Sequence, residues 1–255
     1  MVQQMSTRKV QIQTRMKEND DLTDRIVDQD FISPLIQHKE RFFGIFESSL
    51  MASNEYNLLR LSGLDGIKLM VLSKNYLEPN EVGLAVQSFN KILMNEVEDM
   101  DLRKAALNAL YVTAHVYSLY IVEETLPALM DKLPENSDVR KDSYALTALR
   151  VLCPIASVYT HGMPLLLQKL DAICQQGQRV DDAQEIASVI LNILQAKEND
   201  HEQLVQEIHT MVPYIFRKTI EASLNTAQPS LYLDTNLLQT LSLVIITIFT
   251  KVDSR

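Results

Sequence analysis

A template of aliphatic, arginine and small residues recurs along this chain, and it limits the possible folds more than any other feature. Its clearest copy spans residues 102–110, which read LRKAALNAL. Looser copies surround Arg60, Arg140 and Gln184, so that the template returns every 37 to 44 residues. A period of about 20–50 residues is typical of repeats that bury their apolar faces by stacking on their neighbours. The sequence therefore predicts a stacked array of repeats.

The apolar residues within these repeats follow helical spacing. They predict about ten helices, over residues 34–51, 54–73, 79–95, 99–117, 119–132, 139–160, 163–176, 181–197, 201–224 and 234–251. Glycine is scarce, at 6 of 255 residues, against a usual share of about 7%. Because the connections are short, we expect consecutive helices to pack antiparallel in an all-α fold. Residues 1–32 are expected to form a polar tail or incomplete repeat, and residues 33–255 the repeat array.

Small residues and prolines occupy fixed places in the template. A small residue on the second helix of each pair lets the first helix approach closely, and a proline in the first helix removes one backbone hydrogen bond and bends it. These structural positions are Gly63 and Ala106 for the small residues, and Pro127, Pro164 and Pro213 for the prolines.

Charge and composition exclude some classes of function. The chain has 24 basic and 33 acidic residues and a net charge of −9, which argues against direct binding of nucleic acid or of an anionic membrane. The longest apolar stretch, residues 241–249, is much shorter than the roughly 20 residues of a membrane-spanning helix, and we interpret it as a buried helix. Cys153 and Cys174 form no Cys-x-x-Cys pair, and we expect both to be ordinary buried thiols.

The sequence shows no motif for catalysis, metal binding or a cofactor. His201 and His209 lie eight residues apart, whereas the zinc-protease motif needs a spacing of four. The six glycines form no phosphate-binding loop. We therefore predict no enzyme activity, no catalytic or metal-binding residues and no cofactor, although a helical-bundle enzyme with a cleft of converging ionisable groups remains the rival class.

Two groups of residues are candidates for partner binding. Tyrosine is favoured at interfaces, and Tyr111, Tyr117 and Tyr120 lie close together at the end of one predicted helix. Packing within the helix array is the alternative interpretation of these rings. Glu96 and Glu98 are candidates for an acidic rim that attracts basic partners, the alternative being a solvated loop beside a helix N-terminus.

The template resembles the HEAT repeat. Residues 101–110 match its second helix closely, and residues 138–140 match the start of that helix. The resemblance implies a HEAT-type α-solenoid of about five antiparallel helix pairs. In that family the repeat arginines are commonly structural, which is the role the resemblance implies for Arg60, Arg103 and Arg140.

Two stretches, within residues 34–86 and 103–170, also resemble an internal part of the Mms-nineteen family. This family is the large HEAT scaffold of the cytosolic iron–sulfur assembly targeting complex. The resemblance implies an adaptor that binds cytosolic iron–sulfur assembly factors and apo-proteins of DNA metabolism, in the cytoplasm and nucleus. It also implies that the chain is a fragment of a longer solenoid. A transport receptor or coat-adaptor fragment that binds basic cargo is the alternative.

Overall fold

The computed structural model describes residues 35–73, 75–133, 143–177, 179–196, 201–225 and 230–253. Within these ranges every regular element is a helix and there is no β-strand, which confirms the all-α prediction. The chain forms two compact units, Met1–Ala85 and Val86–Arg255. The predicted tail at residues 1–32 and the repeat position Arg140 lie outside the described residues.

The first unit is built around a tight helix pair. Its elements are η1 (Ile36–His38), α3 (Lys39–Leu50), η2 (Asn54–Tyr56), α4 (Asn57–Leu72) and the start of α5 (Pro79–Leu93). Helices α3 and α4 pack directly against each other. Gly63 makes this approach possible, since a Cβ at this position would lie 2.6 Å from the carbonyl oxygen of Phe46.

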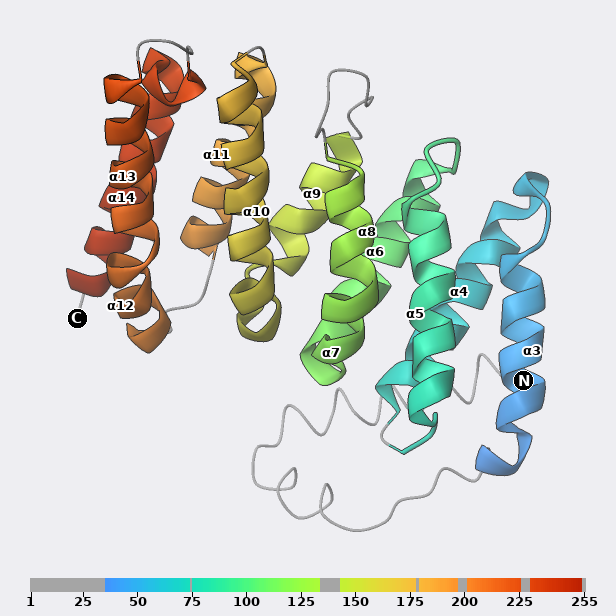
Figure 1. The fold of residues 1–255 in the computed structure, drawn as a ribbon. Coiled ribbons are helices and arrows are strands. Elements are labelled where there is room, and N and C mark those ends of the chain that lie inside the picture. Colours follow the sequence, from blue (N-terminus) through green and yellow to red (C-terminus); the bar gives the residue numbers. More distant parts are fainter. Residues whose placement is uncertain are drawn as a thin grey trace. The chain divides into compact units, whose positions relative to one another are not determined.

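The second unit contains two rows of helices (Figure 1). In one row α6 (Met100–Val116) packs against α9 (Ser143–Leu152), α9 against α11 (Val180–Ala196), and α11 against α14 (Thr235–Asp253). The other row contains α7 (Ser118–Tyr120), the π-helical turn η3 (Ile121–Thr125), α8 (Leu126–Asp131) and α10 (Ala156–Gln176), followed by α12 (His201–His209), α13 (Met211–Leu224) and the short η4 (Leu231–Leu233). The core lies between the rows.

The repeat arginines share one geometry. Arg60 donates from Nε to the carbonyl of Leu50, the last residue of α3, over 3.1 Å. Arg103 donates in the same way to the carbonyl of Leu93, the last residue of α5, over 2.9 Å. Both arginines are buried. Each therefore satisfies a C-terminal carbonyl that the preceding helix leaves without a partner.

Two of the three template prolines lie beside irregular helical turns, and the third lies within a continuous helix. Pro127 lies in the first turn of α8, directly after the π-helical turn. Pro164 lies inside α10. Pro213 follows an interruption at Thr210, and the carbonyl four residues before it belongs to His209, the last residue of α12. A proline cannot donate to that carbonyl and its ring crowds it, so the predicted single helix over 201–224 is divided into α12 and α13.

The predicted boundary between helices 139–160 and 163–176 was wrong. The break falls at residues 153–155, around Pro154, and α10 continues through Gly162. Gly162 remains helical and serves close packing, since a Cβ there would lie 2.8 Å from Sγ of Cys153. The helix instead ends at Gly177, whose φ of 70° is the left-handed conformation of a helix C-cap.

Helix α14 only partly matches the buried helix expected at residues 241–249. One face packs against α11 and α12, while the opposite face is exposed. Among the described helices, α14 is also long and apolar enough to cross a membrane by length and composition alone. The buried face includes Leu241, Val244 and Ile248, and the exposed face includes Leu243, Ile246 and Phe249.

A substitution on α6 tests its packing. Ala106 has no exposed surface, so leucine at this position has to displace its neighbours. We expect Ala106→Leu to lower the free energy of unfolding by roughly 1–3 kcal/mol, measured by chemical denaturation. Asn108→Leu on the exposed side of the same helix is the control, and an equal loss of stability in both variants would contradict the assigned burial.

Candidate partner-binding groove

The tyrosines predicted to bind partners do not form one exposed cluster. Tyr111 is exposed on α6 and its ring packs edge-on against His115, with 4.8 Å between centroids. Tyr117 and Tyr120 are half-buried. Of the three predicted tyrosines, Tyr111 therefore presents the most accessible ring.

The two glutamates predicted to form an acidic rim also differ in their exposure to solvent. Glu96 is exposed and forms an ion pair with Lys132 over 3.4 Å. Glu98 is buried, and its carboxylate accepts a hydrogen bond from the backbone N–H of Asp99 over 3.0 Å. Glu98 thus organises the start of α6 and adds little to an acidic surface, contrary to the interpretation of both glutamates as one rim.

A groove that the sequence analysis did not identify runs between α10 and the α12–α13 segment. Its volume is about 400 Å³ and most of its exposed lining is apolar. We call it the seam groove. It is lined by Tyr159, Thr160, Met163, Pro164, Leu167 and Gln168 of α10, and by Gln203, Gln206, Glu207, Thr210, Met211 and Tyr214 of α12 and α13.

Pro164 and the helix interruption at Thr210 both border the seam groove. Pro164 lines it from α10, and Thr210, at the interruption caused by Pro213, lines it from the other side. The two methionines of the lining, Met163 and Met211, are almost fully buried and form the base of the groove beneath its accessible surface. The groove thus combines an apolar floor with glutamine, threonine and tyrosine groups, a composition that suits a polypeptide ligand.

A smaller polar pocket lies further along the same pair of helices. Its volume is about 240 Å³. It is lined by Asp171 and Gln175 of α10, by Lys218, Glu221, Ala222 and Asn225 at the end of α13, and by Ser230 and Tyr232 at η4. Tyr214 connects the two cavities, because it lines the seam groove and interacts electrostatically with Asp171 and Lys218 of the polar pocket.

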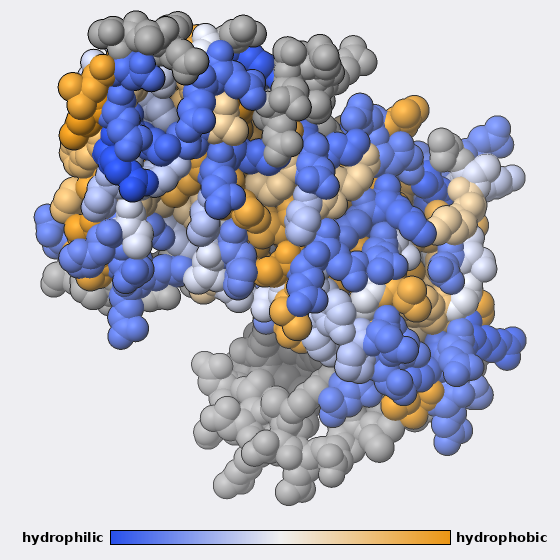
Figure 2. All heavy atoms as spheres, viewed as in Figure 1, coloured by the Kyte–Doolittle hydropathy of each residue, from blue (hydrophilic) through white to orange (hydrophobic). Residues whose placement is uncertain are grey.

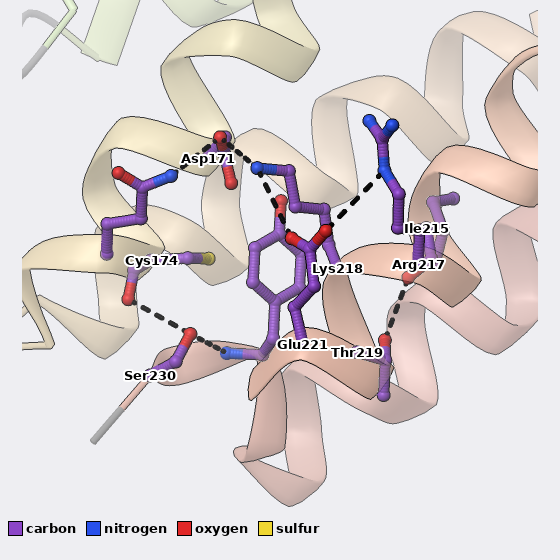
Figure 3. A network of polar contacts seen from close by, with 10 residues as sticks. Asp171, Cys174, Ile215, Arg217, Lys218, Thr219, Glu221 and Ser230 are labelled. Carbon is purple, nitrogen blue, oxygen red and sulfur yellow. Dashed lines mark hydrogen bonds and ion pairs between the residues drawn. The ribbon is translucent and has the colours of Figure 1, made fainter. Parts of the chain in front are cut away.

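An ion pair joins the two walls of the polar pocket. Lys218 donates from Nζ to Oδ2 of Asp171 over 2.8 Å, and less than a fifth of either side chain is exposed. Figure 3 shows the two side chains pointing toward each other from α13 and α10. The hydrogen bond to Asp171 raises the pKa of Lys218, so the ammonium remains charged at neutral pH.

Three phenols near these cavities are held in the neutral form. Burial raises the pKa of Tyr159, Tyr214 and Tyr232. For Tyr214 and Tyr232 the negative charge of Asp171 raises the pKa further. These groups act as hydrogen-bonding groups rather than as bases at neutral pH.

The two cysteines offer a direct test of burial. Burial raises the pKa of each thiol to about 12, and Asp171 contributes to the rise for Cys174. Because the thiolate is the reactive form, we expect neither cysteine to react with a maleimide in the folded chain at pH 7, and both to react in denaturant. Mass spectrometry counts the adducts, and rapid labelling of either thiol before unfolding would contradict this expectation.

The described residues show no arrangement that binds a metal. No group of three or more histidine, cysteine, aspartate or glutamate side chains among them is placed to hold an ion.

The comparisons with known proteins concern the part of the chain that carries both cavities. Residues 145–255 match the family model MMS19_C, described as RNAPII transcription regulator C-terminal. The match covers less than half of the chain and includes the whole of α10 through α14. The chain thus resembles part of the MMS19 family in this region. Among curated proteins, none matches the chain.

Proposed function

We propose that the chain is a HEAT-type solenoid that acts as a protein-interaction scaffold in delivering iron–sulfur clusters to apo-proteins of DNA metabolism. The match of residues 145–255 to the MMS19 family is the observation that carries the proposal. The scaffold would hold assembly factors and client proteins close together, in the cytoplasm and the nucleus. It would bind neither nucleic acid nor a membrane directly.

The helix packing of the second unit supports this function. Helices α6, α9, α11 and α14 follow one another in contact, as the second helices of stacked HEAT pairs do. Such a stack leaves its other row free to present a continuous surface to partners. The seam groove lies between two helices of that other row.

The seam groove is the surface we assign to a partner. It lies inside the residues that match the MMS19 family, and its lining is apolar with polar groups at the edges. Figure 2 shows apolar side chains over the C-terminal helices, interspersed with hydrophilic ones. On α13 the exposed apolar residues are Phe216, Ile220 and Leu224, which recur every four positions.

Affinity capture tests both the function and the groove. The full chain serves as bait in a cytosolic extract, and mass spectrometry identifies the bound proteins. We expect cytosolic iron–sulfur assembly factors or several apo-client proteins to be recovered. Recovery of none of these proteins, with other proteins captured instead, would overturn the assignment to iron–sulfur delivery.

A pair of double variants locates the contact. Thr160→Arg/Gln206→Arg places two long cations in the seam groove at positions whose side chains are exposed. Asn192→Arg/Asn236→Arg places the same two cations at exposed positions on α11 and α14. We expect the first variant to lose the captured proteins and the second to retain them; equal recovery would show that the groove is not the binding surface.

The alternative function is a transport receptor or coat-adaptor fragment that binds basic cargo. Its support is the net charge of −9, which favours positively charged partners. The same capture distinguishes the two functions, because this alternative predicts basic nuclear or vesicle-coat proteins in place of assembly factors.

A further inference from the structure

Helix α14, the last helix of its row (Figure 1), leaves an apolar face exposed. Its other side packs against α11 and α12. On the open face Leu243, Ile246 and Phe249 are 44%, 56% and 41% exposed. Helix α11, one place earlier in the row, has contacts with both α9 and α14. Neighbouring exposed apolar side chains of this kind mark a surface for interaction.

The exposed face of α14 is also free of charge over most of its length. Residues 235–250 contain no aspartate, glutamate, lysine, arginine or histidine, in a chain with a net charge of −9. Charged residues are depleted from the cores of protein interfaces. Two copies of an acidic chain repel each other where their charged surfaces meet, and at this face they approach without that repulsion.

The exposed residues of α14 follow the spacing of a seam between paired helices. Exposed positions recur at alternating intervals of three and four residues, at Asn236, Gln239, Leu243, Ile246, Thr250 and Asp253. This is the spacing of the a and d positions with which two helices pack side by side in a coiled coil. We call these six residues the outer stripe. Its apolar residues lie in the middle and its polar residues at both ends.

The outer stripe is complementary to itself when two copies of α14 run antiparallel. A two-fold axis midway between Leu243 and Ile246 brings the two apolar residues of one copy onto those of the other. An a position then faces a d position in every layer. The layers are Leu243 with Ile246, Gln239 with Thr250, and Asn236 with Asp253, each formed twice.

The polar layers supply hydrogen-bond donors to acceptors. The Thr250 hydroxyl donates to the carbonyl of Ile246 over 2.8 Å, so its oxygen accepts from the side-chain amide of Gln239 of the second copy. The carboxylate of Asp253 accepts from the side-chain amide of Asn236. The ends of the outer stripe thus provide polar partners on both sides of its apolar centre.

Electrostatics favour the antiparallel orientation over the parallel one. A parallel pair would place the two Asp253 carboxylates against each other at the negative ends of both helix dipoles. In the antiparallel pair each carboxylate lies beside Asn236, in the first turn of the other helix, where the dipole attracts negative charge.

We infer that α14 pairs antiparallel with α14 of a second copy of this chain through the outer stripe, forming a two-fold dimer. Because such a contact uses the same surface on both copies, assembly stops at two chains. The contact uses none of the residues that line the seam groove, so each copy keeps its own groove. The inference does not depend on the proposed scaffold function.

Sedimentation equilibrium of the full chain tests the dimer. We expect the mass of the unmodified chain to rise from monomer to dimer with increasing concentration. Leu243→Glu places two carboxylates in each contact, and every desolvated charge costs more than a factor of ten in affinity. We therefore expect the dissociation constant to rise by about 100-fold or more. Leu119→Glu makes the same change on α7, where Leu119 is 61% exposed, and should leave the dimer unchanged.

The same measurement also gives the results that would overturn the inference. These are a monomer at every concentration, an assembly larger than two chains, or equal weakening by Leu243→Glu and Leu119→Glu. Circular dichroism establishes that each variant is folded. Ile246→Lys changes the other residue of the central layers and decides the question if Leu243→Glu does not fold.

Mixing two variants tests the antiparallel register. In a heterodimer of Leu243→Glu with Ile246→Lys, one central layer pairs the new carboxylate with the new ammonium, and the other keeps leucine against isoleucine. We expect the mixture to dimerise at least about tenfold more tightly than either variant alone. A parallel pair would place Leu243 against Leu243 and leave each new charge without an opposite charge, so absence of recovery would overturn the antiparallel pairing.

Discussion

Replacing Gly63 with alanine is expected to destabilise the first unit severely. The added Cβ would lie 2.6 Å from the carbonyl oxygen of Phe46 and 2.9 Å from the backbone nitrogen of Leu50. Both atoms belong to the backbone of α3 and cannot rotate away, so α3 and α4 have to separate. We expect Gly63→Ala to lower the free energy of unfolding by about 3 kcal/mol or more, measured by chemical denaturation.

Gly44 provides a control of opposite sign. It lies on α3, and no atom lies within 4 Å of the Cβ that alanine would add. Because glycine weakens a helix interior relative to alanine, Gly44→Ala should raise the free energy of unfolding by about 0.5–1 kcal/mol. The same chemical change thus has opposite effects at two helical glycines of one unit. If both variants shift stability in the same direction, the close approach of α3 and α4 at Gly63 is wrong.

The sequence predicted the helices well where the spacing of residues within a single helix carries the signal. Arg60 and Gly63 lie within helix α4 and Arg103 and Ala106 within α6, as their local spacing predicted. The errors occurred where packing between two helices determines the role of a residue. The predicted bounds placed Gly162 between two helices, but this glycine packs closely against Cys153 within α10, and the break falls around Pro154. Sequence spacing alone does not distinguish a glycine that ends a helix from one that packs.

The seam groove and the polar pocket were not predictable in this way. Asp171 and Lys218 are 47 residues apart and belong to helices that follow no common motif. Tyr232 lies in the short η4, within a stretch that the sequence analysis treated as the connection before the last helix. Local signals existed only for the interruption at Pro213, which shapes one wall of the groove. Sites formed between repeats depend on how the helices stack, and one sequence carries that information only indirectly.

The ion pair across the polar pocket should contribute strongly to the stability of the second unit. Lys218→Met keeps the aliphatic length of the side chain but leaves the Asp171 carboxylate without its ammonium. Exposed pairs contribute about 0–1 kcal/mol, whereas removing one partner of a fully buried pair costs about 3–5 kcal/mol. With less than a fifth of each side chain exposed, we expect a loss of about 3 kcal/mol in the free energy of unfolding.

Two further variants distinguish the loss of this ion pair from the effect of replacing any lysine by methionine. Lys104→Met removes an exposed pair with Asp101 and should change stability by no more than about 0.5 kcal/mol. Asp171→Asn/Lys218→Met leaves no unpaired charge and should recover part of the loss. A loss in Lys218→Met that is no larger than in Lys104→Met would show that the pair does not hold α10 and α13 together.

The stabilisation by this ion pair should depend on pH only in the alkaline range. Because the pKa of Lys218 is raised in the folded chain, the contribution of the pair is complete at neutral pH. It disappears only as the pH rises through that raised pKa, above the ordinary lysine value of about 10.4.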